Sequence, residues 1–276
     1  MTTAPDAGSP ADPDFVLEHG HRRAREHEVL RTVVGSGLHG IAVEGTDDHD
    51  EMGVHVETPE QRLGVRRTSE HYVARTQPEG ARSGPGDTDL VLYSLRKFLR
   101  LAVKGHPTVL LPLFAGEDDV VVLRETGRRL RELGPSLLSQ ESGHRFLGYL
   151  RSQRDRVAGA AGRGVPNRPE LVAAHGYDTK YASHALRLAL QGLEVVGHGR
   201  LTLPMPAEER EVVLSVKRGE RSREQALDLV DLHARRLEDL LASGRSPLPE
   251  RVDVAAVDAW STAEHLAHWR RAGLLG

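Results

Sequence analysis

Cysteine is absent from this chain of 276 residues. Its absence excludes disulfide bonds and thiolate metal sites, so any metal must be held by carboxylate or imidazole groups. It also favours a cytoplasmic location. No apolar stretch approaches the roughly 20 residues that a membrane span needs, so we expect no membrane segment. Residues 1–13 lack the apolar core and basic leader of a signal peptide, and their Ala, Pro, Asp and Gly content predicts a disordered tail.

Aromatic residues are scarce, at 4% of the chain, which argues against a protein that stacks single-stranded bases on aromatic rings. A formal net charge of -3 gives no sign of sequence-independent coating of nucleic acid. Lysine is also rare, because the basic charge is almost all arginine. The only lysines are Lys97, Lys104, Lys180 and Lys217. Each is a candidate for a specific role, although each could equally reflect drift.

The residue pattern changes along the chain. Up to about Phe114, strands are indicated at Val29–Val34, Met52–Glu57 and Asp87–Tyr93, with a hairpin or strand pair across Leu63–Thr76. A helix is indicated before the first strand, from Asp14 to Leu30, and another after Ser94, which has the character of an N-cap. The later apolar spacing predicts helices over Leu123–Leu138, Gly143–Ala158, Asp178–Val196, Ala207–Val216, Ser222–Leu241 and Asp253–Ala272. The sequence therefore predicts an α+β fold, with an α/β domain at 14–120 and an all-α domain at 121–276.

A glycine-rich turn directly follows the first predicted strand. It begins with Gly35 and Ser36 and ends at Gly40. Such a turn exposes backbone N–H groups and a hydroxyl, which suits phosphate binding. Taken alone it also fits an ordinary tight turn, and it matches neither the Walker nor the Rossmann pattern.

Two groups of aspartates open later strands. Asp48 and Asp50 point the same way on an extended backbone, where two buried carboxylates would need a cation between them. Mg²⁺ is the natural candidate because it prefers oxygen ligands and shares its shell with phosphates. Asp89 lies on another strand, and Asp87 competes for the same role on the same face. Each group by itself favours a solvated acidic loop.

The combination is similar to the DNA-polymerase-β nucleotidyltransferases: a strand, then Gly-Ser, then Asp-x-Asp opening the next strand, then a lone Asp on a later strand. Two-metal chemistry explains this set, since shared carboxylates must hold one metal near the attacking hydroxyl and another on the triphosphate. Asp48, Asp50 and Asp89 are then the predicted catalytic residues and metal ligands, with Mg²⁺ or Mn²⁺ as cofactor. Asp48 and Asp50 would bridge both metals.

Within this superfamily the chain resembles the RlaP-type family, named for an RNA repair pathway DNA polymerase β. The stretches Val33–Glu57, Asp89–Phe114 and His175–Pro204 carry the resemblance. Asp47 and His106 depart from it, where the family usually has Ser and Asn. The resemblance implies a palm-like catalytic domain with a mixed sheet, followed by a helical domain that closes over the nucleotide.

The third stretch supplies candidate phosphate ligands. Lys180, His184, Arg187 and Gln191 follow one another at spacings of four, three and four, so they form one stripe on a helix. The resemblance favours a stripe that faces the triphosphate, whereas the residues alone favour a solvated basic face. We predict nucleotide binding by Gly35, Ser36, Lys180, His184 and Arg187.

The predicted function is metal-dependent transfer of an NMP from an NTP to an acceptor hydroxyl. The family name implies that the acceptor is the 3′ end of an RNA, and a tRNA is one such RNA. A protein or a small-molecule hydroxyl is an alternative acceptor. A nucleotide-binding sensor without catalysis is a second hypothesis, although a sensor has no physical reason to keep a repulsive acidic cluster.

Overall fold

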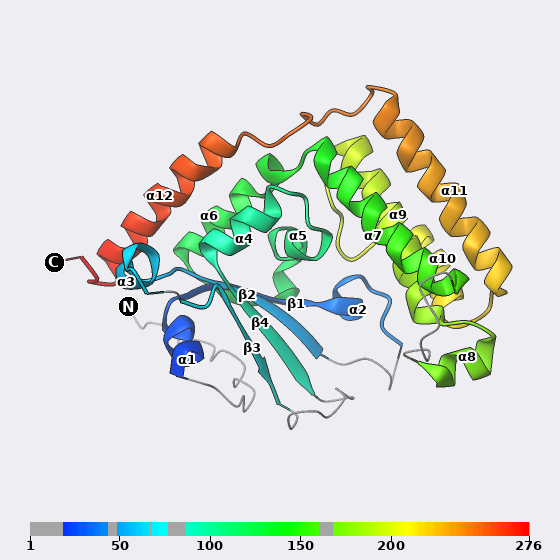
Figure 1. Cartoon of the computed structure of the whole chain (residues 1–276), viewed down its shortest axis with the longest axis horizontal. Coiled ribbons are helices and arrows are strands. Elements are labelled where there is room, and N and C mark those ends of the chain that lie inside the picture. The colour runs from blue at the N-terminus through cyan, green and yellow to red at the C-terminus, as the bar shows by residue number, and fades with distance from the viewer. Residues whose placement is uncertain (1–18, 44–48, 67, 77–86, 160–167, 276) are drawn as a thin grey trace, which may run out of the picture.

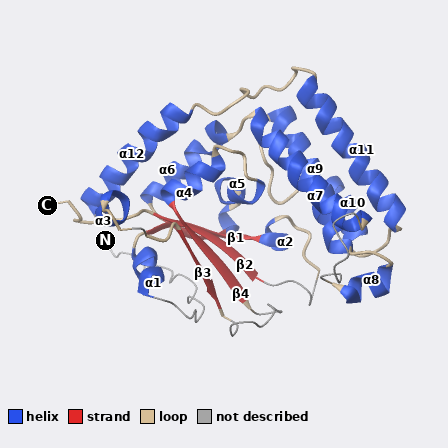
Figure 2. Cartoon of the chain, in the orientation of Figure 1, coloured by secondary structure: helices blue, strands red, loops and turns tan. Residues whose placement is uncertain are grey.

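The computed structural model describes residues 19–43, 49–66, 68–76, 87–159 and 168–275. Their fold is α+β, as predicted: a mixed five-stranded sheet and its helices form one half, and a group of long helices forms the other (Figures 1 and 2). The strands lie in the order β3-β4-β2-β1-β5. Their bounds are β1 Glu28–Val34, β2 His49–His55, β3 His71–Arg75, β4 Thr88–Ser94 and β5 Val120–Leu123.

The two central strands, β2 and β4, run parallel, and the other neighbouring pairs are antiparallel. Burial alternates along β4 as its sequence predicts, with Leu90 and Leu92 buried and Asp89 partly exposed. Ser94 then caps the next helix by accepting a hydrogen bond from the Lys97 backbone N–H. Because β2 and β4 are parallel and His49 pairs with Thr88, both strands begin at the same edge of the sheet, and this edge carries Asp50 and Asp89.

Several helices belong to the sheet half. They are α1 His19–Glu26, α2 Gly35–Leu38, α3 Pro59–Leu63, α4 Leu95–Ala102, α5 Pro107–Phe114 and α6 Glu125–Leu133, with 3₁₀ turns η1 Glu117–Asp119 and η2 Gly134–Leu137. Apolar residues of α4 and α5, such as Phe98 and Leu110, pack against Leu30 and Val54 of the sheet in one continuous core. This core also includes α9, so the two halves share apolar packing.

The helical half is built around one central helix. Its members are α7 Gln140–Ala158, α8 Pro169–His175, α9 Thr179–His198, α10 Ala207–Lys217 and α11 Arg223–Ala242. Helix α9 packs against α7, α10 and α11 (Figure 1). Asp178 caps α9 by accepting hydrogen bonds from the backbone N–H groups of Lys180 and Tyr181. The predicted helix from Asp178 is thus confirmed.

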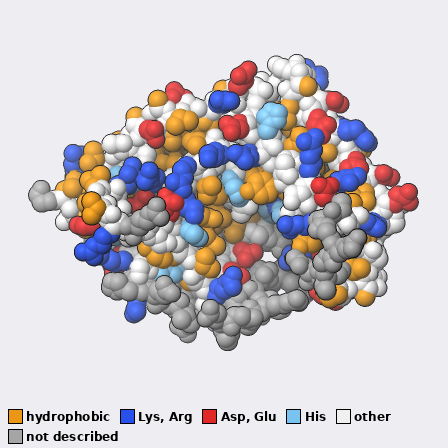
Figure 3. All heavy atoms as spheres, in the orientation of Figure 1, with side chains coloured by type: hydrophobic (Ala, Val, Ile, Leu, Met, Phe, Trp, Pro, Cys, Tyr) orange, Lys and Arg blue, Asp and Glu red, His pale blue; other side chains and the backbone are white. Residues whose placement is uncertain are grey.

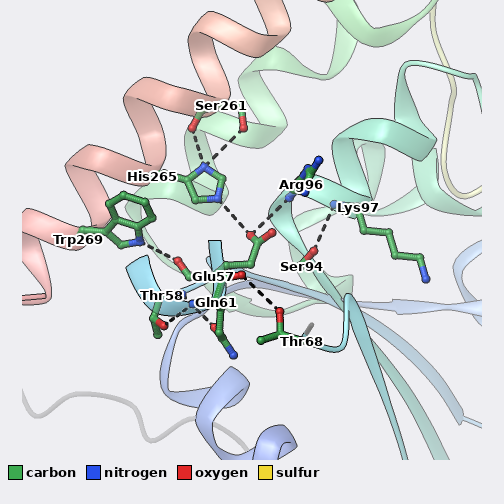
Figure 4. A network of polar contacts seen from close by, with 10 residues as sticks. All are labelled: Glu57, Thr58, Gln61, Thr68, Ser94, Arg96, Lys97, Ser261, His265 and Trp269. Carbon is green, nitrogen blue, oxygen red and sulfur yellow. Dashed lines mark hydrogen bonds and ion pairs between the residues drawn. The ribbon is translucent and has the colours of Figure 1, made fainter. Parts of the chain in front are cut away.

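The last helix, α12 Val254–Arg271, returns to the sheet half and is held there by buried polar contacts. His265 Nε2 lies 3.1 Å from Glu57 Oε2, and Trp269 donates to the Glu57 carbonyl at 2.7 Å (Figure 4). Burial opposes ionisation of Glu57, but the hydrogen bond and charge of His265 outweigh it, so the pKa of Glu57 lies below its usual range. The predicted helical region 121–276 therefore ends with a segment that packs against α4 and the chain after β2, in the sheet half.

Replacing His265 with alanine is expected to lower the free energy of unfolding by about 3 kcal/mol, because it leaves Glu57 buried without its partner. His144→Ala, on an exposed face of α7, is the matched control and should change it by less than about 0.5 kcal/mol. Because the pKa of Glu57 is lowered, the stabilisation is present above the unfolded pKa of about 4.3. The difference between the wild type and His265→Ala should therefore shrink as the pH falls through the folded pKa. Denaturant unfolding at several pH values measures this, and equal stability of the two proteins at pH 7 would contradict it.

Some predicted elements were wrong. The strand pair across Leu63–Thr76 is instead the end of α3, a connection and the single strand β3. Helix α3 forms because Thr58 and Gln61 make a capping box ahead of Pro59. The helix predicted to run to Leu30 ends at Glu26, and the turn at Gly35 is the short helix α2. Residues 14–18 lie outside the described residues, as does the predicted tail.

The helix predicted over Leu123–Leu138 was also partly wrong. The run Val120–Leu123 forms β5, which pairs with β1, and only then does α6 begin. Three consecutive valines favour a strand, and β1 offered a free edge for them. The predicted boundary at residue 120 thus falls at the start of a strand of the sheet. Helix α8 was not predicted. Within the described residues, no helix has the length and apolar character needed to cross a bilayer.

Candidate functional site

Strand register brings Asp50 and Asp89 together. Asp50 of β2 is the Cα partner of Asp89 on β4 and of Val34 on β1, and Arg75 on β3 is the partner of Asp89. Paired residues on neighbouring strands project to the same face, about 4.8 Å apart between strands. The two predicted carboxylates therefore lie side by side. The exposed Arg75 pairs with Asp89, with Nε 3.3 Å from Oδ1.

Gly35 lies against the Asp50 carboxylate. It follows Val34 with φ +78, a left-handed conformation that L side chains rarely adopt. A Cβ at this position would lie 2.7 Å from Asp50 Oδ2, so a larger residue would displace the carboxylate. Ser36 is the next residue in the turn and is half-buried, with its carbonyl accepting a hydrogen bond from Ile41 at 3.0 Å. The predicted pair Gly35 and Ser36 thus adjoins one member of the predicted aspartate set.

The helical half holds the chain that follows this turn. Gln191 of α9 hydrogen-bonds the buried His39, at 3.1 Å between Nε2 and Nδ1. Lys217 of α10 donates to the Ile41 carbonyl at 2.8 Å, and Met205 N–H donates to the His39 carbonyl at 3.3 Å. These contacts fix the Gly35–Gly40 turn relative to α9.

Arg187 connects to the same turn through Gln191. Its guanidinium donates to Gln191 Oε1 at 2.9 Å, so the Gln191 amide NH₂ must face His39, whose Nδ1 then accepts. His39 is therefore neutral. Burial, with the charges of Arg187 and His184, agrees by holding the pKa of His39 well below its usual range. Burial also lowers the pKa of Arg187 to about 10, which leaves it charged at neutral pH. Among the described residues, Arg187 has no carboxylate partner.

The rest of the predicted stripe lies along the same helix. Lys180 is exposed in the first turn of α9, and His184 is half-buried between it and Arg187. Burial, followed by the charges of Arg187, Lys180, Arg156 and Arg168, lowers the pKa of His184 to about 3. Four cations therefore act on His184 along this side of α9.

Sequence reasoning missed several residues that belong to this region. Arg156 of α7 and Arg168 lie over the ring of Tyr181, at 5.2 Å and 5.1 Å from its centroid. Arg168 also pairs with the cap residue Asp178, with NH1 3.2 Å from Oδ2. No local pattern marks Arg156 and Arg168 as neighbours of α9, because tertiary packing brings them there. His39, by contrast, lay within the glycine-rich motif and could have been selected.

The residues at the sheet edge suit a hard divalent cation. Asp50 and Asp89 offer carboxylate oxygens on one face, and their charges would repel each other without a cation. The pKa of His49 is raised, first by its hydrogen bond to Glu51 and then by the charges of Glu51 and Asp50. This shift reflects the negative charge near the sheet edge. Asp48 lies outside the described residues, and within those residues no cluster of three or more His, Asp or Glu forms a metal site.

The structure separates Asp89 from its competitor Asp87. Asp87 precedes β4, and its Oδ1 lies 3.4 Å from Thr76 Oγ1. Only Asp89 is in register with Asp50. Figure 3 shows acidic side chains at the bottom of a hollow near the centre of this face, with basic side chains around it.

The chain was compared with protein families, curated proteins and solved structures. A solved structure described as a nucleotidyltransferase-like protein from Exiguobacterium sibiricum 255-15 has a TM-score of 0.31 and 13% sequence identity, covering 80% of this chain and 71% of that one. A likeness of that degree carries no weight for function. No curated protein matches the chain. The family model described as RlaP, RNA repair pathway DNA polymerase beta family, matches residues 16–265. The predicted resemblance is confirmed, and the chain belongs to the RlaP family.

Proposed function

We propose that the protein is a metal-dependent nucleotidyltransferase that moves an NMP from an NTP to an acceptor hydroxyl. One observation supports this most: Asp50 and Asp89 lie in register beside the Gly35 turn, and that turn is joined through His39 and Gln191 to the charged Arg187. A negative sheet edge and a positive helix face, joined by hydrogen bonds, suit a metal-bound triphosphate. Family membership supports the same class of reaction.

The chemistry follows from the charges of these residues. The acceptor oxygen bonds to the α-phosphorus, the bond from that phosphorus to the β-phosphate bridging oxygen breaks, and pyrophosphate leaves. Divalent metal held by Asp48, Asp50 and Asp89 would neutralise the developing charge and lower the pKa of the acceptor hydroxyl. Asp89 would take that proton. Arg187 would bind phosphate oxygens through its guanidinium fork, with Lys180 as a point charge and His184 as a neutral hydrogen-bonding group.

The acceptor is an RNA 3′ end in this proposal, as the family description suggests. The test incubates the full chain with Mg²⁺ or Mn²⁺ and each α-labelled NTP, offering total RNA, cell protein and an aminoglycoside as separate acceptors. Label in RNA alone supports the proposal and identifies the nucleotide. Label in protein or aminoglycoside would overturn the RNA acceptor but keep the enzyme class. Metal-dependent stabilisation by NTP without any transfer would favour a sensor instead.

Gly35→Ala is expected to remove most of the activity, because the added Cβ would push against the Asp50 carboxylate in a strained left-handed conformation. The strain should lower the free energy of unfolding by about 1–2 kcal/mol. Gly37→Ala in the same turn is the matched control, since its added Cβ would have no atom within 4 Å. Steady-state kinetics and denaturant unfolding of both variants measure these effects. Equal activity of the two variants would show that Gly35 does not shape the site.

A further inference from the structure

A second basic site lies at the opposite end of the strands that carry Asp50 and Asp89. It is a groove of about 630 Å³ formed by α3, residues 64–66 and 68–70, and the first turn of α4. Ser94 lines the groove, and Asp89 lies five residues earlier on the same strand. At about 3.3 Å per residue, roughly 17 Å separate the two positions. The groove is therefore distinct from the aspartate site.

The charged residues that line the groove are four cations and two carboxylates. They are Arg62, Arg66, Arg96, Lys97, Glu57 and Glu70. Both carboxylates are paired with residues outside this set. Glu57 lies 3.1 Å from His265 Nε2, and Glu70 accepts two hydrogen bonds from Arg100 at 3.0 Å and 2.8 Å. The positive charge of the groove is therefore not neutralised by its own acidic residues.

Within the described residues, none of the four cationic side chains forms a hydrogen bond or ion pair with a carboxylate; the charge of Glu70 acts on Lys97 and Arg96 without such a contact. No hydrogen bond or ion pair within that part of the chain involves the side chains of Arg62, Arg66 or Arg96. Lys97 Nζ lies 2.9 Å from His71 Nδ1, and burial, together with the charge of Lys97, lowers the pKa of His71. Neutral His71 therefore accepts from Lys97 and orients its charge without cancelling it.

The base of the groove is fixed by the packing of α12. Glu57 is held by His265 and by Trp269, and its carboxylate lies 3.5 Å from the Arg96 backbone N–H (Figure 4). Arg96 and Lys97 extend from the α4 turn that this carboxylate adjoins, and Ser94 caps that turn. The groove thus combines a rigid base with long cationic side chains around it.

We propose that this groove binds a second ligand that carries two or more phosphate groups. Guanidinium groups recognise phosphate through two parallel hydrogen bonds, and three of the four cations are arginines. The volume of the groove lies in the range that small-molecule sites occupy. A small polyphosphorylated molecule and the backbone of a nucleic acid both present this chemistry.

Isothermal titration with inorganic tripolyphosphate in EDTA and low salt tests the proposal. The parent protein for every measurement is the full chain with Arg187→Met. This substitution weakens phosphate binding at the α9 stripe of Lys180, His184 and Arg187, so that binding there is not mistaken for binding in the groove. Adding Arg62→Gln and Arg96→Gln is expected to weaken tripolyphosphate binding at least tenfold. Arg62→Lys with Arg96→Lys should retain most of the binding. Arg245→Gln with Arg251→Gln, at two exposed arginines in the connection between α11 and α12, is the charge-matched control and should bind as the parent does.

Unchanged binding in the double glutamine variant, or no binding by its Arg187→Met parent, would overturn the proposal. Both substituted arginines lie at the surface without side-chain partners, so the fold should persist and circular dichroism will verify it. A short single-stranded RNA that displaces tripolyphosphate would assign the groove to a nucleic acid backbone. Its salt dependence should then lose about 1.4 from the log–log slope in the double variant. Failure of the RNA to compete would assign the groove to a small phosphorylated ligand.

Discussion

Asp89→Asn is expected to reduce kcat/KM for nucleotidyl transfer by on the order of 10³-fold while the fold remains intact. The substitution keeps the shape of the side chain but removes a charge that faces Asp50 across the parallel pair. Stability should change little, because the relief of repulsion with Asp50 offsets the loss of the exposed ion pair with Arg75. Steady-state kinetics with a fixed acceptor and saturating Mg²⁺ measure the loss.

Asp87→Asn is the matched control for that substitution. Asp87 lies two residues earlier and contacts Thr76. Unlike Asp89, it is not in register with Asp50 of β2. We expect its activity to stay within about threefold of the wild type, since a single surface charge change usually has a small effect. A large loss in Asp87→Asn with little loss in Asp89→Asn would reverse the assignment of the third carboxylate.

Arg187→Met is expected to lower kcat/KM for the NTP by about 10²-fold. Methionine preserves much of the aliphatic packing but removes the charge that would contact phosphate. The substitution removes a charge that has no carboxylate partner among the described residues, but it also leaves the buried Gln191 Oε1 without its donor, so the free energy of unfolding should change by no more than about 1–2 kcal/mol. Kinetics and denaturant unfolding of the same preparations separate the two effects.

Two further variants sharpen the role of Arg187. Gln191→Leu removes the hydrogen bond that orients Arg187 and the one to His39, but it keeps the charge of Arg187, so the loss should be smaller, about tenfold. Arg236→Met, an exposed arginine on α11, is the control for the same chemical change and should be active. A less stable but fully active Arg187→Met protein would contradict a phosphate-binding role and indicate a structural one.

Local patterns in the sequence predicted much of the fold. Alternation along the predicted strand Asp87–Tyr93 placed Asp87 and Asp89 on one face, and the cap residue Ser94 marked where a helix begins. These features depend on neighbours within a few residues. The choice between Asp87 and Asp89 does not, because it requires the register of β4 on β2, which involves residues about forty positions apart.

Contacts between distant segments could not be predicted from the sequence alone. His39 and Gln191 are separated by 152 residues, and no local pattern pairs them. The strand β5 was not predicted, because its pairing with β1 depends on a free sheet edge, and the predicted helix began at its last residue, Leu123. The return of α12 to Glu57 is another case, since it rests on partners 208 residues apart. Tertiary packing, rather than propensity, decides these features.

The most direct test of the central claim compares α-labelled and γ-labelled ATP, or whichever NTP proves active, with the full chain and its acceptor. We predict that the α label enters the acceptor, that the γ label leaves as pyrophosphate, and that EDTA or Asp89→Asn abolishes both. Transfer of the γ label to the acceptor, or transfer of the α label that survives EDTA and Asp89→Asn, would contradict metal-dependent nucleotidyl transfer at this site.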